Sequence, residues 1–138
     1  MDHQKLVTLL VKHEDLKLKP YTDTVGKLTI GVGHNLTDLG LSVPQVLAIL
    51  DDDIENVLHF LDLKLPWWRS LDDVRSRALV DMTFNLMGKI LEFKKMLAAI
   101  QAHDWDGAST HLLDSTFAHQ VGQRAIDLAK MFRTGQDA

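Results

Sequence analysis

The chain has 138 residues, of which 46% are hydrophobic and 25% are charged, and this balance is typical of one ordinary globular domain rather than a disordered or membrane protein. Its formal net charge of −4 disfavours nucleic acid as a partner, because phosphate backbones attract basic proteins. The absence of cysteine excludes disulfide scaffolds, thiolate metal sites and cysteine nucleophiles.

The first 42 residues predict a helix followed by a β-hairpin. Hydrophobic residues recur at helical spacing over residues 5–14. Their run is short and interrupted by charged residues, so we expect neither a signal peptide nor membrane insertion. Residues 28–32 alternate between apolar and polar or small side chains after a turn that contains Gly26, which favours a hairpin.

From residue 41 onward the pattern is helical throughout. Ser42 and Gln45 have the spacing of a capping box, and a long apolar stripe then runs to the break at Pro66. Asp104 is the expected cap of a later helix, and Gly135 the stop of the last one. The expected helices cover residues 43–65, 70–88, 91–100, 105–113 and 121–132.

These elements predict an α+β, mostly helical fold made of a single domain with two lobes. We expect an N-terminal helix and hairpin lobe at residues 1–42, a linking helix at 43–65 and a helical lobe at 66–138. Two lobes joined by a helix leave a cleft, which is the usual place for a ligand.

Glu14 lies at the end of the predicted first helix, on the same face as Val7, Leu10 and Val11. Desolvation of a carboxyl group on that face would favour its protonated form, which a general acid requires. The position is also typical of a solvated glutamate at a frayed helix end, so the local pattern leaves both interpretations open.

Asp23 and Thr29 form a second candidate pair. A hairpin centred on Gly26 would make them direct cross-strand neighbours, with Cβ atoms about 5 Å apart. A carboxylate beside a hydroxyl can hold a water molecule, with the aspartate accepting its proton and the threonine fixing its direction. Aspartate also favours turns and threonine favours strands whatever their function, so this pattern has a purely structural alternative.

Residues 14–34, EDLKLKPYTDTVGKLTIGVGH, resemble the active-site segment of the phage-type lysozymes, glycoside hydrolase family 24. The shared pattern is a glutamate, an aspartate nine residues later, a threonine six residues further on, and then Ile-Gly-x-Gly-His. Further segments resemble the family in the same order, so that the resemblance covers most of the chain: 70–75, 78–79, 84–85, 87–88, 105, 123–125 and 132–135.

The resemblance implies a role for seven residues. Those carried over from the family are the catalytic residues Glu14, Asp23 and Thr29, the substrate-binding residues Phe84 and Asn85, and the supporting residues His34 and Arg124, with Arg124 ion-paired to Glu14. The chain is shorter than the family's T-even phage member between His34 and Pro44, which implies a reduced N-terminal lobe.

The resemblance further implies an endolysin-type muramidase that hydrolyses the β-1,4 bond between N-acetylmuramic acid and N-acetylglucosamine in bacterial peptidoglycan, by an inverting mechanism. Its expected partner is the peptidoglycan glycan strand, bound by a monomer without a cofactor. A lytic transglycosylase, which needs no water-holding pair, and a catalytically silent wall-binding module are the alternatives. We expect storage in the host bacterial cytoplasm until release, and action in the periplasm.

Three conspicuous features are not interpreted as functional. The seven histidines show no metal-ligand spacing, so no metal site is expected. Residues 51–53, all aspartate, fit the polar face of the long helix rather than a calcium loop. Trp67 and Trp68 follow a helix break, where aromatic side chains pack on a core more often than they bind sugars.

Overall fold

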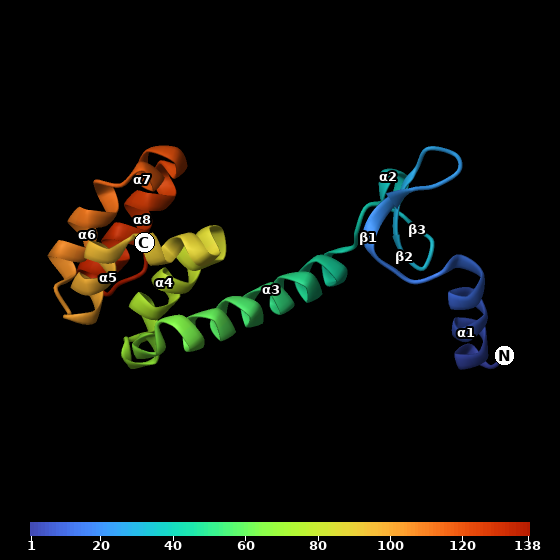
Figure 1. Ribbon diagram of the computed structural model, residues 1–138, viewed down its shortest axis with the longest axis horizontal. Helices are drawn as coiled ribbons and strands as arrows, with labels where there is room; N and C mark the ends of the chain where they lie inside the picture. The colour runs from blue at the N-terminus through green and yellow to red at the C-terminus, as the bar shows by residue number, and fades with distance from the viewer. The chain divides into compact units, whose positions relative to one another are not determined.

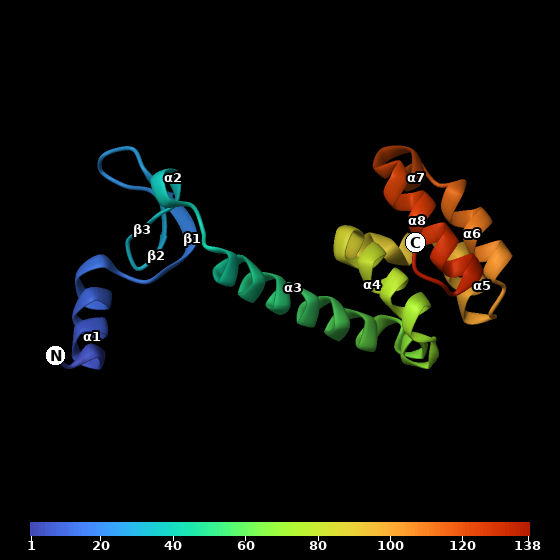
Figure 2. The ribbon, with the colours of Figure 1, turned by 180° about the vertical axis from the view of Figure 1, so that it is seen from behind.

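The computed structural model describes all 138 residues and has the α+β, mostly helical fold that the sequence predicts. The chain divides into two compact units, residues 1–49 and residues 50–138. The boundary between them falls inside the predicted linking helix rather than at one of its ends. Figures 1 and 2 label the α-helices and strands of both units.

The N-terminal unit contains α1 (His3–Glu14), β1 (Lys17–Thr22), β2 (Leu28–Gly31), β3 (His34–Asn35) and α2 (Leu36–Leu39), and α3 (Val43–Lys64) runs on into the C-terminal unit. The C-terminal unit continues with η1 (Pro66–Ser70), α4 (Asp73–Leu86), η2 (Met87–Glu92), α5 (Lys94–Gln101), α6 (Trp105–Leu113), α7 (Thr116–Val121) and α8 (Gln123–Thr134). No helix is both long enough and apolar enough to cross a membrane.

Helix α1 confirms the predicted first helix. The Asp2 side chain accepts a hydrogen bond from the Lys5 N–H and so caps its first turn. The helix ends at Glu14 because Asp15 adopts a positive φ of 67°, and the Asp15 N–H donates to the Val11 carbonyl. No residue of α1 is buried.

The predicted hairpin is present as strands β1 and β2, but its register differs from the expected one. Tyr21 pairs with Thr29, so the hairpin is centred one residue before Gly26. The cause is the turn: the Gly26 N–H donates to the Asp23 carbonyl, and Gly26 has a φ of +83°. This is the three-residue loop that ends in a left-handed glycine, and it projects beyond the two strands in Figure 1.

The sheet has a third strand that the sequence does not reveal. Strand β3 pairs antiparallel with β2, so the strand order is β1-β2-β3. It has only two residues, too few for a detectable alternation, and α2 follows at once. Strand β1 also contains an irregularity between Lys17 and Tyr21, where Pro20 has no N–H to donate to the ladder.

Two capped helix starts are predicted correctly, whereas α4 and α5 each begin three residues later than expected. Ser42 and Gln45 exchange the two hydrogen bonds of a capping box before α3, and Asp104 caps α6 as expected. The expected last helix, at residues 121–132, is α8, and the sequence does not predict α7 before it; Gly122, with a φ of +56°, separates the two. Helix α4 stops two residues early, at Leu86, because Met87 has a φ of +47°.

The core lies entirely in the C-terminal unit, where α8 packs against α4, α6 and α7 (Figure 2). Its largest fully buried hydrophobic side chains are Leu61, Leu79, Met82, Ile90, Met96, Ile100, Leu112 and Phe132. Trp68 is 5% exposed and donates its indole N–H to Asp62, which confirms that it is a packing residue. Trp67 packs against the same core.

Candidate active site

Glu14 is the last residue of α1, and its carboxylate lies against Gly33 in the turn between β2 and β3. A methyl group on Gly33 would lie 2.9 Å from Oε2 and 3.1 Å from Cδ of Glu14. Gly33 itself has a φ of +65°, which a side chain would disfavour. Two independent requirements therefore place a glycine beside this carboxylate.

The other side chains of residues 1–49 do not remove water from Glu14, as the expected desolvation would require. Glu14 is exposed, and so are its apolar helix neighbours Leu9 and Leu10, with 47% and 44% of their surface accessible. The physical reason is size, because a unit of 49 residues has too few side chains to cover a helix and a sheet together. The helical spacing of apolar residues therefore predicted the helix correctly. Its apolar face is not covered within residues 1–49, and the expected desolvation of Glu14 stays a prediction.

Asp23 closes the hairpin turn with its side chain as well as its backbone. Its Oδ1 accepts hydrogen bonds from the Val25 N–H at 3.0 Å and from the Lys27 N–H at 2.8 Å. Two donors on one oxygen fix the orientation of the carboxylate. The turn makes no use of Oδ2, which is the oxygen left for other chemistry.

Thr29 is 3% exposed and is the only buried residue of the N-terminal unit. Its hydroxyl donates to the Lys27 carbonyl oxygen at 3.0 Å. The sequence predicts Asp23 as its direct cross-strand neighbour, but in the structure Tyr21 holds that position. Asp23 and Thr29 are instead linked through the two backbone groups of Lys27, the N–H for one and the carbonyl for the other.

His34 begins β3, where it pairs with Ile30. Its Nε2 lies 2.6 Å from the Gly40 carbonyl oxygen, so the ring donates a hydrogen bond across the loop that contains α2. This bond holds the end of the sheet and, with it, the turn that carries Gly33.

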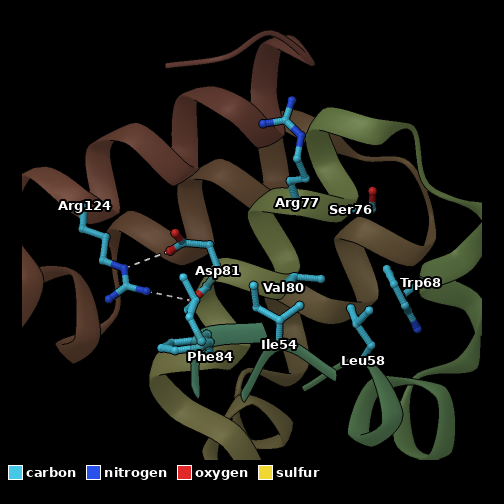
Figure 3. A pocket seen from close by; sticks show the side chains of 10 residues that line it. Ile54, Leu58, Trp68, Ser76, Arg77, Val80, Asp81, Phe84 and Arg124 are labelled. Carbon is cyan, nitrogen blue, oxygen red and sulfur yellow. Dashed lines mark hydrogen bonds and ion pairs between the residues drawn. The ribbon is translucent and has the colours of Figure 1, made fainter. Parts of the chain in front are cut away.

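Phe84 and Arg124 lie together on a groove of about 600 Å³ in the C-terminal unit (Figure 3). Phe84 is 39% exposed there. Asn85 is exposed on α4 but does not line the groove. The lining side chains are mainly apolar: Leu50, Ile54 and Leu58 from α3, Trp68 from η1, Ser76, Arg77, Val80, Asp81 and Phe84 from α4, and Arg124 from α8.

Arg124 has a partner in its own unit that the sequence does not predict. Its Nε donates to Asp81 Oδ1, and its second amino group to the Asp81 carbonyl oxygen, both at 2.9 Å. Figure 3 shows the guanidinium directed at both acceptors. The pairing of Arg124 with Glu14 that the family resemblance implies joins residues of different units, and it stays a prediction.

Sequence reasoning missed three residues of this arrangement: Lys27, Gly33 and Asp81. Lys27 acts through its backbone, which leaves no trace in residue type. Gly33 belongs to the Ile-Gly-x-Gly-His motif, and that motif was the available indication of a close approach. Asp81 is 43 residues from Arg124, and no local pattern connects the two.

A family model described as phage lysozyme matches residues 11–131, which include every candidate residue named above. The chain belongs to the phage lysozyme family. It is therefore a lysozyme-type glycoside hydrolase.

Individual relatives are distant but cover most of the chain. The protein named "Probable T4-type lysozyme 1" of Dictyostelium discoideum is 26% identical, with 92% of each chain covered. An endolysin of Acyrthosiphon pisum secondary endosymbiont phage 1 is 28% identical, with 88% of this chain and 84% of that protein covered. The pre-baseplate central spike protein Gp5 of Enterobacteria phage T4 is 25% identical, and the match covers 96% of this chain but only 28% of the spike protein.

Proposed function

We propose that this lysozyme cleaves the β-1,4 bond between N-acetylmuramic acid and N-acetylglucosamine in bacterial peptidoglycan, with Glu14, Asp23 and Thr29 as its catalytic residues. Membership of the phage lysozyme family and similarity to a protein named endolysin support the substrate. The observation that carries the mechanism is the shared attachment of Asp23 and Thr29 to Lys27.

The hydrogen bonds of Asp23 and Thr29 leave one oxygen on each side chain that can accept a hydrogen bond from a water molecule. The Thr29 hydroxyl donates its proton to the Lys27 carbonyl oxygen, so its own oxygen can accept a further hydrogen bond. Asp23 Oδ2 is the second acceptor. A water that donates one proton to each side chain keeps a lone pair for attack on the sugar, and Asp23 takes the proton as general base.

Glu14 is the general acid of the proposed reaction. It transfers its proton to the glycosidic oxygen as the bond to the leaving sugar breaks, while the water attacks from the opposite face. Because Glu14 is exposed in its own unit, the bound glycan must remove the surrounding water and so favour the protonated carboxyl group. Room for the water and the sugar requires carboxyl groups about 6.5 to 9.5 Å apart, which is the spacing of inverting glycosidases.

Four other residues have lesser roles in the proposal. Phe84, an exposed aromatic side chain, is available to stack on a sugar ring, and the Asn85 amide to bond an acetamido group. His34 supports the sheet through Gly40, and Arg124 supports the fold through its ion pair. We further propose that the enzyme acts as a monomer on peptidoglycan in the periplasm, after storage in the host bacterial cytoplasm.

The anomeric form of the first product tests the mechanism. Proton NMR of soluble glycan fragments, recorded before mutarotation, should show the α anomer, because a single attack on a β-linked sugar inverts the configuration. A β anomer would mean that Asp23 forms a covalent intermediate, and a 1,6-anhydro sugar would identify a lytic transglycosylase. Failure to clear a suspension of permeabilised Gram-negative cells would leave only a silent wall-binding module.

A further inference from the structure

We propose that Gly33 is a positioning residue that sets the place of the Glu14 carboxylate, an inference that rests on the proposed role of Glu14 as the acid. The absent side chain of Gly33 provides the space that the carboxylate occupies. A methyl group there would lie 2.9 Å from Oε2, 3.1 Å from Cδ and 3.3 Å from Cγ of Glu14. The first distance is shorter than a van der Waals contact allows.

The two sides of this contact differ in stiffness. Gly33 is flanked by the pairing of Ile30 with His34 and by the bond from His34 to Gly40, so its backbone is a fixed surface. Glu14 is an exposed side chain at the end of a helix and can change rotamer. A larger residue at position 33 would therefore displace the carboxylate and leave the backbone in place.

This asymmetry separates activity from stability. Moving the exposed end of a flexible side chain costs the fold little, but here that end is the group that must donate the proton. A misplacement of about 1 Å in a catalytic group can lower the rate about 100-fold. Gly33 is thus needed for two reasons: its backbone has a positive φ, and the absence of a side chain leaves the Glu14 carboxyl group where it can deliver its proton.

Gly31 provides a matched control in the same motif. Its φ is +67°, against +65° for Gly33, and a methyl group on Gly31 would meet no atom within 4 Å. Gly31→Ala and Gly33→Ala therefore impose the same backbone strain. Only Gly33→Ala touches Glu14.

The kinetic experiment compares the two variants on soluble peptidoglycan fragments, corrected for the folded fraction. Both should show a similar fall in Tm. Gly33→Ala should lower kcat about 10- to 100-fold more than Gly31→Ala does, with KM unchanged, because the acid is displaced while glycan binding is kept. Equal kcat values for the two variants would overturn the proposal.

An NMR experiment tests the same contact without activity. The chain has three glutamates, at positions 14, 55 and 92, so carbon-13 labelled glutamate gives three side-chain carboxyl signals, and Glu14→Gln identifies the first. Gly33→Ala should shift the Glu14 signal alone, and Gly31→Ala should shift none. If Gly33→Ala does not fold, the wild-type protein still tests the contact. A nuclear Overhauser effect between Glu14 Hγ and Gly33 Hα is expected, and its absence would overturn the proposal.

The positioning role and the proposed function fail in different ways. If Glu14→Gln keeps its activity, Glu14 is not the acid, whatever the Gly33 variants do. If Glu14→Gln is inactive while Gly33→Ala and Gly31→Ala behave alike, the proposed function stands and the positioning role is wrong.

Discussion

The two units of this lysozyme divide stability and chemistry between them. Every buried hydrophobic side chain lies in residues 50–138, whereas residues 1–49 bury only Thr29. The proposed catalytic residues Glu14, Asp23 and Thr29 all lie in the unit without a core. In that unit the carboxylate of Asp23 is held by hydrogen bonds to a turn, and the carboxylate of Glu14 lies against a glycine.

The difference shows how a small unit can order carboxylates without burying them. A carboxylate fixed by two backbone N–H groups, as Asp23 is, keeps its orientation and remains accessible to a ligand. Burial would give the same order but would close the site. The consequence is a less stable unit. Little of its apolar surface is removed from water, so hydrophobic burial offsets only a small part of the conformational entropy lost on folding.

The largest effect that follows concerns fragments of the chain. Residues 50–138 contain the whole core, so this fragment should fold alone and unfold cooperatively. Residues 1–49 should not fold alone, because three short strands and a helix without a core do not offset their conformational entropy. Circular dichroism with thermal melting of each purified fragment checks this. A cooperative transition in the 1–49 fragment would mean that burial is not what separates the units.

The next effect is on catalysis. Glu14→Gln keeps the size of the side chain but removes the transferable proton, so lytic activity should fall by at least about 100-fold. The melting curve should change little, because the Glu14 side chain is exposed within its own unit and the substitution keeps its size. Glu55→Gln makes the same chemical change on the exposed surface of α3 and should leave turbidity clearance of permeabilised cells unaltered. Near wild-type clearance by Glu14→Gln would remove the acid from the proposed mechanism.

The comparison also explains what the sequence could predict. The starts of α3 and α6 are predicted correctly because the capping side chains of Ser42, Gln45 and Asp104 bond backbone groups three residues away. Such bonds depend on local spacing alone. The starts of these two helices could therefore be predicted from the sequence alone.

The errors lie where distant or backbone groups decide the structure. The hairpin register depends on the kind of turn that Asp23 and Gly26 form together, which one glycine alone does not specify. The ion pair of Arg124 with Asp81 likewise depends on which side chain a separate helix brings to it, and no local pattern in the sequence shows that. The proposed catalytic residues come from the family motif rather than from their surroundings, and their roles stay a prediction.

A pair of leucine substitutions sharpens the contrast in stability. Leu79 is fully buried in α4, so Leu79→Ala should lower the free energy of unfolding by about 2 to 5 kcal/mol through lost burial and the cavity left behind. Leu18 in β1 is 86% exposed, and Leu18→Ala should change the free energy of unfolding by less than about 0.5 kcal/mol. Urea unfolding measures both values. A large loss for Leu18→Ala would show that the sheet is covered in solution.

The smallest effect is a pH dependence located in the C-terminal unit, at the junction of α3 and η1. Hydrogen bonds from the Arg69 guanidinium and then from the Trp68 indole N–H lower the pKa of Asp62 to about 2. The ionised carboxylate therefore stabilises the fold above the pKa of the unfolded chain, about 3.9, and this contribution is lost as the pH falls towards 2. Asp62→Asn removes the charge but keeps an acceptor for the indole.

Wild type should accordingly melt slightly above Asp62→Asn at pH 6, and the difference in Tm should close between about pH 4 and pH 2. The effect is small because the pair is exposed to solvent, and added salt should reduce it further. If the Asp62→Asn difference is the same at pH 2 and pH 6, the carboxylate is held by packing against Trp68 and not by its charge.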